Sequence, residues 1–68
     1  MITTDHELDT TLERIRHLQG QLAHLRKVET NPMNYRLSAS GLLAEIDRMQ
    51  LEVREYLSVH PGERRASP

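Results

Sequence analysis

The sequence has no cysteine, tryptophan or phenylalanine, and two tyrosines are its only aromatic residues. Without cysteine the chain can form neither a disulfide nor a thiolate metal site. With 68 residues it is expected to form a single domain. A domain this small usually needs a disulfide, a metal or oligomerisation to be stable. Because disulfides are excluded and no metal motif is present, we expect self-association.

Long apolar runs and a large excess of charge are also missing. A membrane-spanning helix needs about 18 consecutive apolar residues, and the chain has no such run. Residues 1–5 lack the basic start and apolar stretch of a signal peptide, so we expect a cytoplasmic protein. The formal net charge is −1, with nine basic residues spread along the chain, whereas a nucleic-acid module normally has a basic stripe. Nucleic acid is therefore not the expected partner.

The clearest pattern lies in residues 35–56, where apolar side chains recur at alternating steps of four and three. This spacing is typical of the seam of a coiled-coil helix. The seam consists of Tyr35, Ala39, Leu42, Ile46, Met49, Val53 and Tyr56. It predicts a helix that packs this side against another helix, with the two tyrosine hydroxyls at the rim.

A second seam precedes it and consists of Leu8, Thr11, Ile15, Leu18, Leu22 and Leu25, widened by Leu12. Thr4 and Glu7 have the spacing of a capping box, in which a hydroxyl and a carboxylate bond the first turn of a helix. Arg26 and Lys27 place positive charge at the other end, where the helix dipole favours it. We predict a helix from about residue 5 to residue 28, after a short lead-in.

The break between the seams is Glu29-Thr30-Asn31-Pro32. Proline cannot continue the preceding helix, but it suits the first position of the next one, with Asn31 as its N-cap. The second helix is predicted from about residue 32 to residue 58. Residues 38–41 (Ser-Ala-Ser-Gly) have low helix propensity and could instead separate a short turn from a later helix. We favour one helix because the seam keeps its phase across them.

The predicted fold is therefore all-α, an antiparallel two-helix hairpin over residues 1–60, because so short a connection makes the helices neighbours. Residues 61–68 have no apolar anchor and are predicted to form a disordered tail.

A second apolar stripe lies outside the seam of the second helix. It consists of Leu37, Leu43, Ala44, Leu51 and Leu57. A helix that is apolar on two sides is usually buried on two sides, so we predict a homodimer in which second helices meet in a four-helix bundle. A monomer with scattered exposed leucines is the alternative. Parallel pairing, a domain-swapped dimer and a tetramer also fit the heptads.

No residue type occurs in a pattern that indicates catalysis. His17 and His24 are seven residues apart, about 10 Å along a helix, and cannot share a metal ion. Glu45, Arg48 and Glu52 have the spacing of ion pairs on a solvated helix surface. Ser38 and Ser40 have no nearby histidine to activate them. We expect no catalytic residue, no metal and no cofactor, and hence no enzyme.

An opening Met1-Ile2-Thr3, a leucine-rich first helix, an Asn31-Pro32 break and the segments 43–47 and 52–57 resemble a group of short bacterial helical proteins of uncharacterised function. In some similar chains such a hairpin precedes the helix-turn-helix domain of antitoxin-like regulators. The resemblance implies an antitoxin-like or regulator-binding partner in transcriptional regulation, acting through protein contacts. It carries over no functional residue. The residues themselves predict a non-enzymatic, self-associating protein–protein interaction module.

Overall fold

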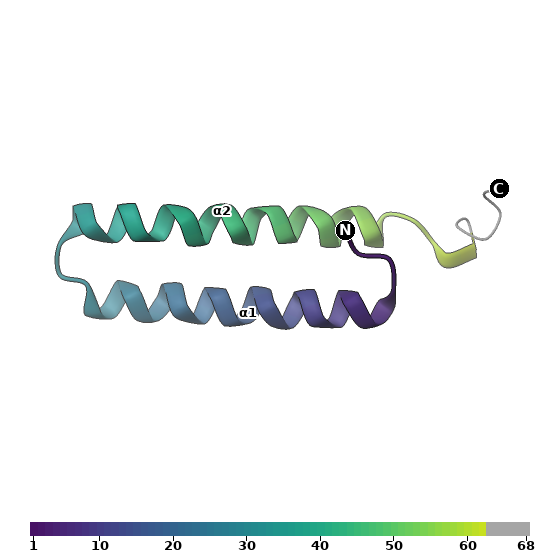
Figure 1. Ribbon diagram of the computed structural model, residues 1–68, viewed down its shortest axis with the longest axis horizontal. Helices are drawn as coiled ribbons and strands as arrows, with labels where there is room; N and C mark the ends of the chain where they lie inside the picture. Colours follow the sequence, from purple (N-terminus) through teal and green to yellow (C-terminus); the bar gives the residue numbers. More distant parts are fainter. Residues whose placement is uncertain (63–68) are drawn as a thin grey trace.

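The computed structural model describes residues 1–62, which form two helices, α1 (Asp5–Val28) and α2 (Pro32–Leu57). The helices run in opposite directions and lie side by side along their length (Figure 1). The predicted all-α antiparallel hairpin is therefore confirmed. Residues 63–68, which make up most of the predicted tail at 61–68, lie outside the described residues.

The first turn of α1 is held by the predicted cap. The Thr4 hydroxyl oxygen accepts a 3.1 Å hydrogen bond from the Glu7 backbone N–H. The Glu7 carboxylate reaches back to the Thr3 hydroxyl, which donates to it at 2.7 Å. At the other end the Glu29 backbone N–H donates to the Leu25 carbonyl at 2.9 Å and closes the last turn. At both ends of α1, backbone groups that lack a partner within the helix therefore form hydrogen bonds with neighbouring residues of the chain.

The start of α2 follows from Asn31 and Pro32 in the same way. The Asn31 side-chain oxygen accepts from the backbone N–H groups of Met33 and Asn34, at 2.9 and 3.3 Å. α2 then continues without interruption through residues 38–41. The prediction of a single helix is therefore confirmed, and the alternative of a break at these residues is wrong. The Ser40 hydroxyl donates to the Leu37 carbonyl at 2.9 Å, which satisfies it within the helix.

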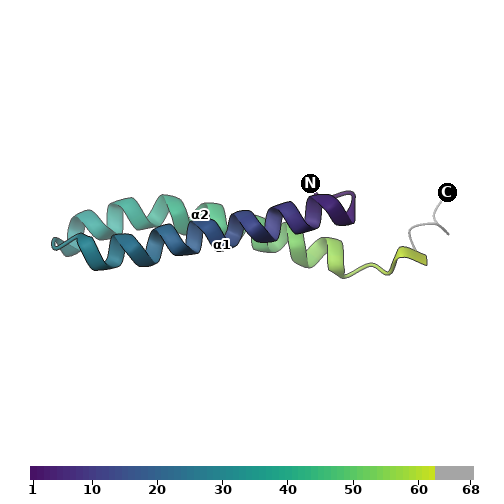
Figure 2. The ribbon, with the colours of Figure 1, turned by 90° about the horizontal axis from the view of Figure 1, so that it is seen from below.

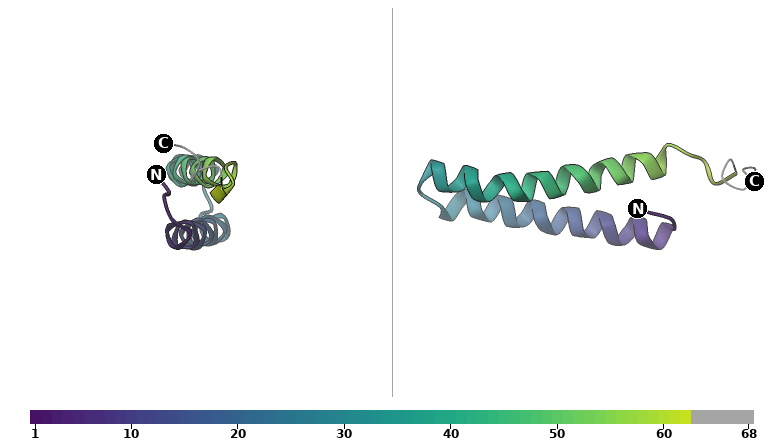
Figure 3. Two further views of the ribbon diagram at one scale, coloured as in Figure 1. Left: turned by 90° about the vertical axis from the view of Figure 1, so that its right-hand side faces the viewer. Right: turned by 45° about the horizontal axis from the view of Figure 1, so that its top comes forward.

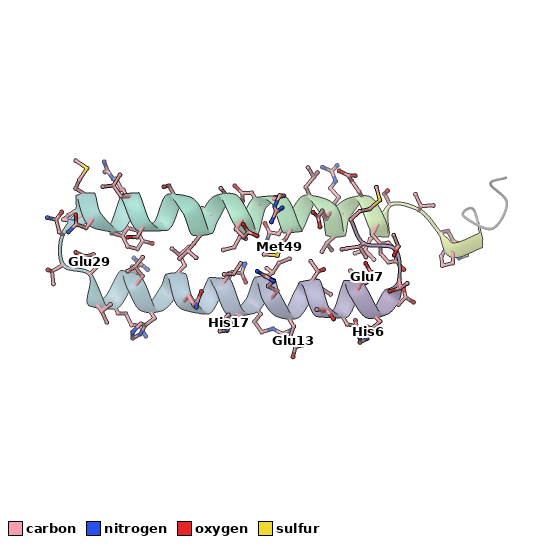
Figure 4. All side chains as sticks on the ribbon, viewed as in Figure 1. His6, Glu7, Glu13, His17, Glu29 and Met49 are labelled. Carbon is pink, nitrogen blue, oxygen red and sulfur yellow. The ribbon has the colours of Figure 1, made fainter. Side chains whose placement is uncertain are left out.

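The core between the helices is small. Its buried centre consists of Ile15, Ile46 and Met49, with Leu18, Leu22 and Val53 half-buried around it. Ala39 is buried on the same side of α2, nearer the turn. In Figure 4 the Met49 side chain points into the space between the helices, which cross at a shallow angle in Figure 2. The two predicted seams therefore supply the contact between α1 and α2.

The lead-in at residues 1–4 is more than the short connection expected from the sequence. It folds back from the start of α1 towards the end of α2, as Figures 1 and 3 show, and Ile2 is only 5% exposed. The Tyr56 hydroxyl donates to the Asp5 carboxylate at 2.6 Å. The Met1 ammonium lies 3.9 Å from the Glu52 carboxylate. These contacts close the end of the hairpin opposite the turn.

Candidate interaction surface

The apolar stripe predicted outside the α2 seam is not covered by α1. Its residues are Leu37, Leu43, Ala44, Leu51 and Leu57, which we call the outer leucine face. The four leucines are between 45% and 69% exposed, and Ala44 is also exposed. The hairpin therefore exposes all five along α2. Leu37, Ala44 and Leu51 lie on one side of the helix, and Leu43 and Leu57 lie nearer its seam.

Met33 extends the outer leucine face by one turn. It lies four residues before Leu37, on the same side of the helix, and is equally exposed. Met33 is not among the residues predicted from the sequence, because it does not follow the seven-residue spacing of Leu37, Ala44 and Leu51. The four-residue step from Met33 to Leu37 was the signal that could have identified it. From Met33 to Leu51 the apolar positions on this side of α2 extend over about 27 Å along the helix.

Small residues follow Leu37 on this side of α2. They are Ser40, Gly41 and Ala44, and the exposed Arg48 lies one turn after Ala44, before Leu51. Apart from its chain neighbours and the backbone of its own helix, a methyl group added at Gly41 would meet no atom within 4 Å. The backbone of α2 is therefore accessible to another helix near these small residues, between the larger side chains of Leu37 and Leu51.

The outer side of α1 has a different character. Its exposed residues are mostly polar: Glu13, Arg16, His17, Gly20, Ala23, His24 and Lys27. In Figure 4 Glu13 and His6 point away from α2. Among the large apolar residues of α1, only Leu12 and Val28 are exposed, and they are 16 residues apart. Most of the exposed large apolar residues of the two helices therefore belong to α2.

The groups that could carry chemistry are dispersed on the surface. Within residues 1–62 no polar or charged side chain is buried, and no group of three or more histidines and carboxylates is placed to hold a metal. His17 and His24 border a shallow, open, mainly apolar groove that Leu25 and Leu42 also line.

Ser40, Glu45 and Arg48 have partners on their own helix. The Ser40 hydroxyl donates a hydrogen bond within α2. Arg48 and Glu45 form an exposed ion pair.

The Glu7 carboxylate is a capping group. Its pKa lies below the ordinary value of 4.5, chiefly because the Thr3 hydroxyl donates a hydrogen bond to the ionised form. Its partners belong to its own helix terminus, so the shift reflects helix capping.

Neither α1 nor α2, the helices of the described part of the chain, combines the length and the apolar character needed to cross a bilayer. The resemblance to short bacterial hairpins and antitoxin-like regulators stays a prediction. Comparison with protein-family models, with curated proteins and with solved structures gives no significant match.

Proposed function

We propose that this protein is a non-enzymatic interaction module that associates with itself through the outer leucine face. In the proposed assembly the α2 helices of two hairpins meet and form a four-helix bundle with two-fold symmetry. The observation that carries the proposal is the exposure of Leu37, Leu43, Leu51 and Leu57 along one helix. The proposal includes a cytoplasmic location.

The shape of the hairpin supports a partner. Its helices of 24 and 26 residues are about 36 and 39 Å long, and each is covered by the other helix on one side. A second copy could lie along the uncovered side of α2 over this length.

The size of the core supports the same proposal. Helices of 24 and 26 residues share a core in which only Ile15, Ala39, Ile46 and Met49 are buried, with Ile2 added from the lead-in. Most helix stability in proteins comes from packing of an apolar face. A dimer would bury the second apolar side of α2, so that this helix would be packed on two sides and not only on the side that faces α1.

Two matched substitutions test the interface. Ala44 lies at the centre of the outer leucine face, and Ala23 lies on the polar outer side of α1; both are exposed. A glutamate at either position would stand four residues before a basic residue, Arg48 or Lys27, so effects within the helix are similar. Ala44→Glu should raise the dissociation constant of the dimer by about tenfold or more, because it places a charged side chain in a largely apolar interface. Ala23→Glu should leave it unchanged.

Sedimentation equilibrium over a range of protein concentrations measures both constants. A wild-type chain that stays monomeric throughout would contradict the proposal. Equal effects of the two substitutions would show that the interface is elsewhere.

A further inference from the structure

Building on the proposed self-association, we infer that the two hairpins pair in opposite directions. The α2 helix of one copy runs antiparallel to that of the second copy, and the two-fold axis crosses the helices near Ala44. The occupant of the outer leucine face is thus a second copy of this chain in one defined orientation.

The charge distribution along the hairpin carries this inference. The turn half, residues 17–44, has three basic side chains, Arg26, Lys27 and Arg36, against one acidic side chain, Glu29. The open half, residues 1–16 and 45–62, has eight carboxylates against four arginines. With neutral histidines the side-chain charge is +2 in the turn half and −4 in the open half. Because both helices run the full length of the hairpin, these charges lie at opposite ends of the molecule (Figure 1).

The two orientations of a symmetric dimer differ in which charged halves of the two hairpins face each other. In a parallel pair the turn half faces a turn half and the open half faces an open half, so like charges meet at both ends. In an antiparallel pair each positive turn half faces a negative open half. Charge complementarity sets the orientation of association even where apolar contacts supply the affinity.

The apolar residues allow this reversal. Leu37 and Leu51 are each seven residues from Ala44. In an antiparallel pair with the two-fold axis near Ala44, Leu37 of each copy lies opposite Leu51 of the other copy. The dimer therefore contains this contact twice. Ser40, Gly41 and Ala44 then lie at the crossing point, where small residues allow the two backbones to approach closely.

Cross-linking distinguishes the orientations because the chain has no native cysteine. Leu37→Cys and Leu51→Cys are prepared separately, one of them isotope-labelled, and treated with a bifunctional maleimide much shorter than the roughly 21 Å between the two positions along a helix. In an antiparallel dimer, position 37 of one copy lies opposite position 51 of the other. The mixture should therefore give cross-links between the labelled and the unlabelled variant, and neither variant should cross-link to itself. Ala44→Cys, near the axis, should link to itself, whereas Ala23→Cys on the outer side of α1 should not link in any mixture.

Salt dependence of the wild-type dimer gives a second, independent readout. Raising NaCl from about 50 to about 200 mM screens the attraction between opposite halves, so the dissociation constant should rise, by about two- to threefold. In a parallel dimer the same salt would screen repulsion, and the constant would fall.

The outcomes separate this inference from the proposed function. Links of each variant to itself, together with tighter association in salt, would establish a parallel dimer; the orientation would then be wrong and the self-association would stand. A dimer that gives no cross-links at positions 37, 44 and 51 uses another face, which overturns both the orientation and the interface proposed above. A wild-type monomer overturns both.

Discussion

At the residue scale, Glu7 shows how a single hydrogen bond links sequence to pH dependence. Its carboxylate accepts from the Thr3 hydroxyl in the folded chain, so its folded-state pKa lies below the 4.5 of an unfolded glutamate. Ionised Glu7 therefore favours the folded state above about pH 4.5. This contribution is lost as the pH falls through the lower folded-state pKa.

Thr3→Val should raise the pKa of Glu7 towards its ordinary value, because it removes the largest cause of the shift. A carboxyl titration followed by NMR measures the change. Thr10→Val is the matched control, since the Thr10 hydroxyl donates to the His6 carbonyl instead. An unchanged Glu7 pKa in Thr3→Val would show that this hydrogen bond does not persist in solution.

At the scale of one helix, Gly20 weakens α1 without a packing reason. Apart from its chain neighbours and the backbone of α1, a methyl group at this position would meet no atom within 4 Å. Gly20→Ala should therefore raise the free energy of unfolding by about 1 kcal/mol, the difference in helix propensity between the two residues. Urea denaturation at a fixed protein concentration measures it.

Gly41→Ala is the informative comparison for that experiment. It offers the same gain in propensity and the same open space within one chain. The proposed second copy would approach the added methyl group, so the gain at Gly41 should be smaller than at Gly20. An equal gain at both positions would count against close packing at Gly41.

The lead-in is the element whose role the sequence did not reveal. Ile2 is buried where the segment returns to α2, and it shares a surface hollow with Tyr56 and Glu52. Ile2→Ala should cost about 2 kcal/mol of stability, at the low end for a buried isoleucine because the site lies at the end of the hairpin. Thermal and urea unfolding measure the loss. Val28→Ala is the control, as it truncates an exposed aliphatic residue. A loss no larger than that of Val28→Ala would mean that the lead-in does not stabilise the hairpin.

At the scale of the whole molecule, association and stability should be coupled. If the folded hairpin dimerises, the wild-type melting temperature rises with protein concentration, because the dimer draws the equilibrium towards the folded state. Leu51→Glu should favour the monomer, lower the melting temperature and remove its concentration dependence. Differential scanning calorimetry at several concentrations measures this. The same concentration dependence in Leu51→Glu and the wild type would refute an interface at Leu51.

The sequence by itself determined the two helices and the break between them. Thr4 and Glu7 cap α1, Asn31 and Pro32 start α2, and the four–three spacing of apolar residues selects the sides that meet. These signals act between residues close together in the chain, so they can be read without coordinates. The stripe of Leu37, Leu43, Ala44, Leu51 and Leu57 was recognisable for the same reason.

Only the tertiary structure decided what happens at the open end and on the outer side of α2. The bond from Tyr56 to Asp5 joins residues 51 apart, and the burial of Ile2 depends on where α2 ends. Neither leaves a local pattern in the sequence. The exposure of the outer leucine face is also a tertiary property, because it depends on the single helix α1 covering one side of α2 and leaving the other open.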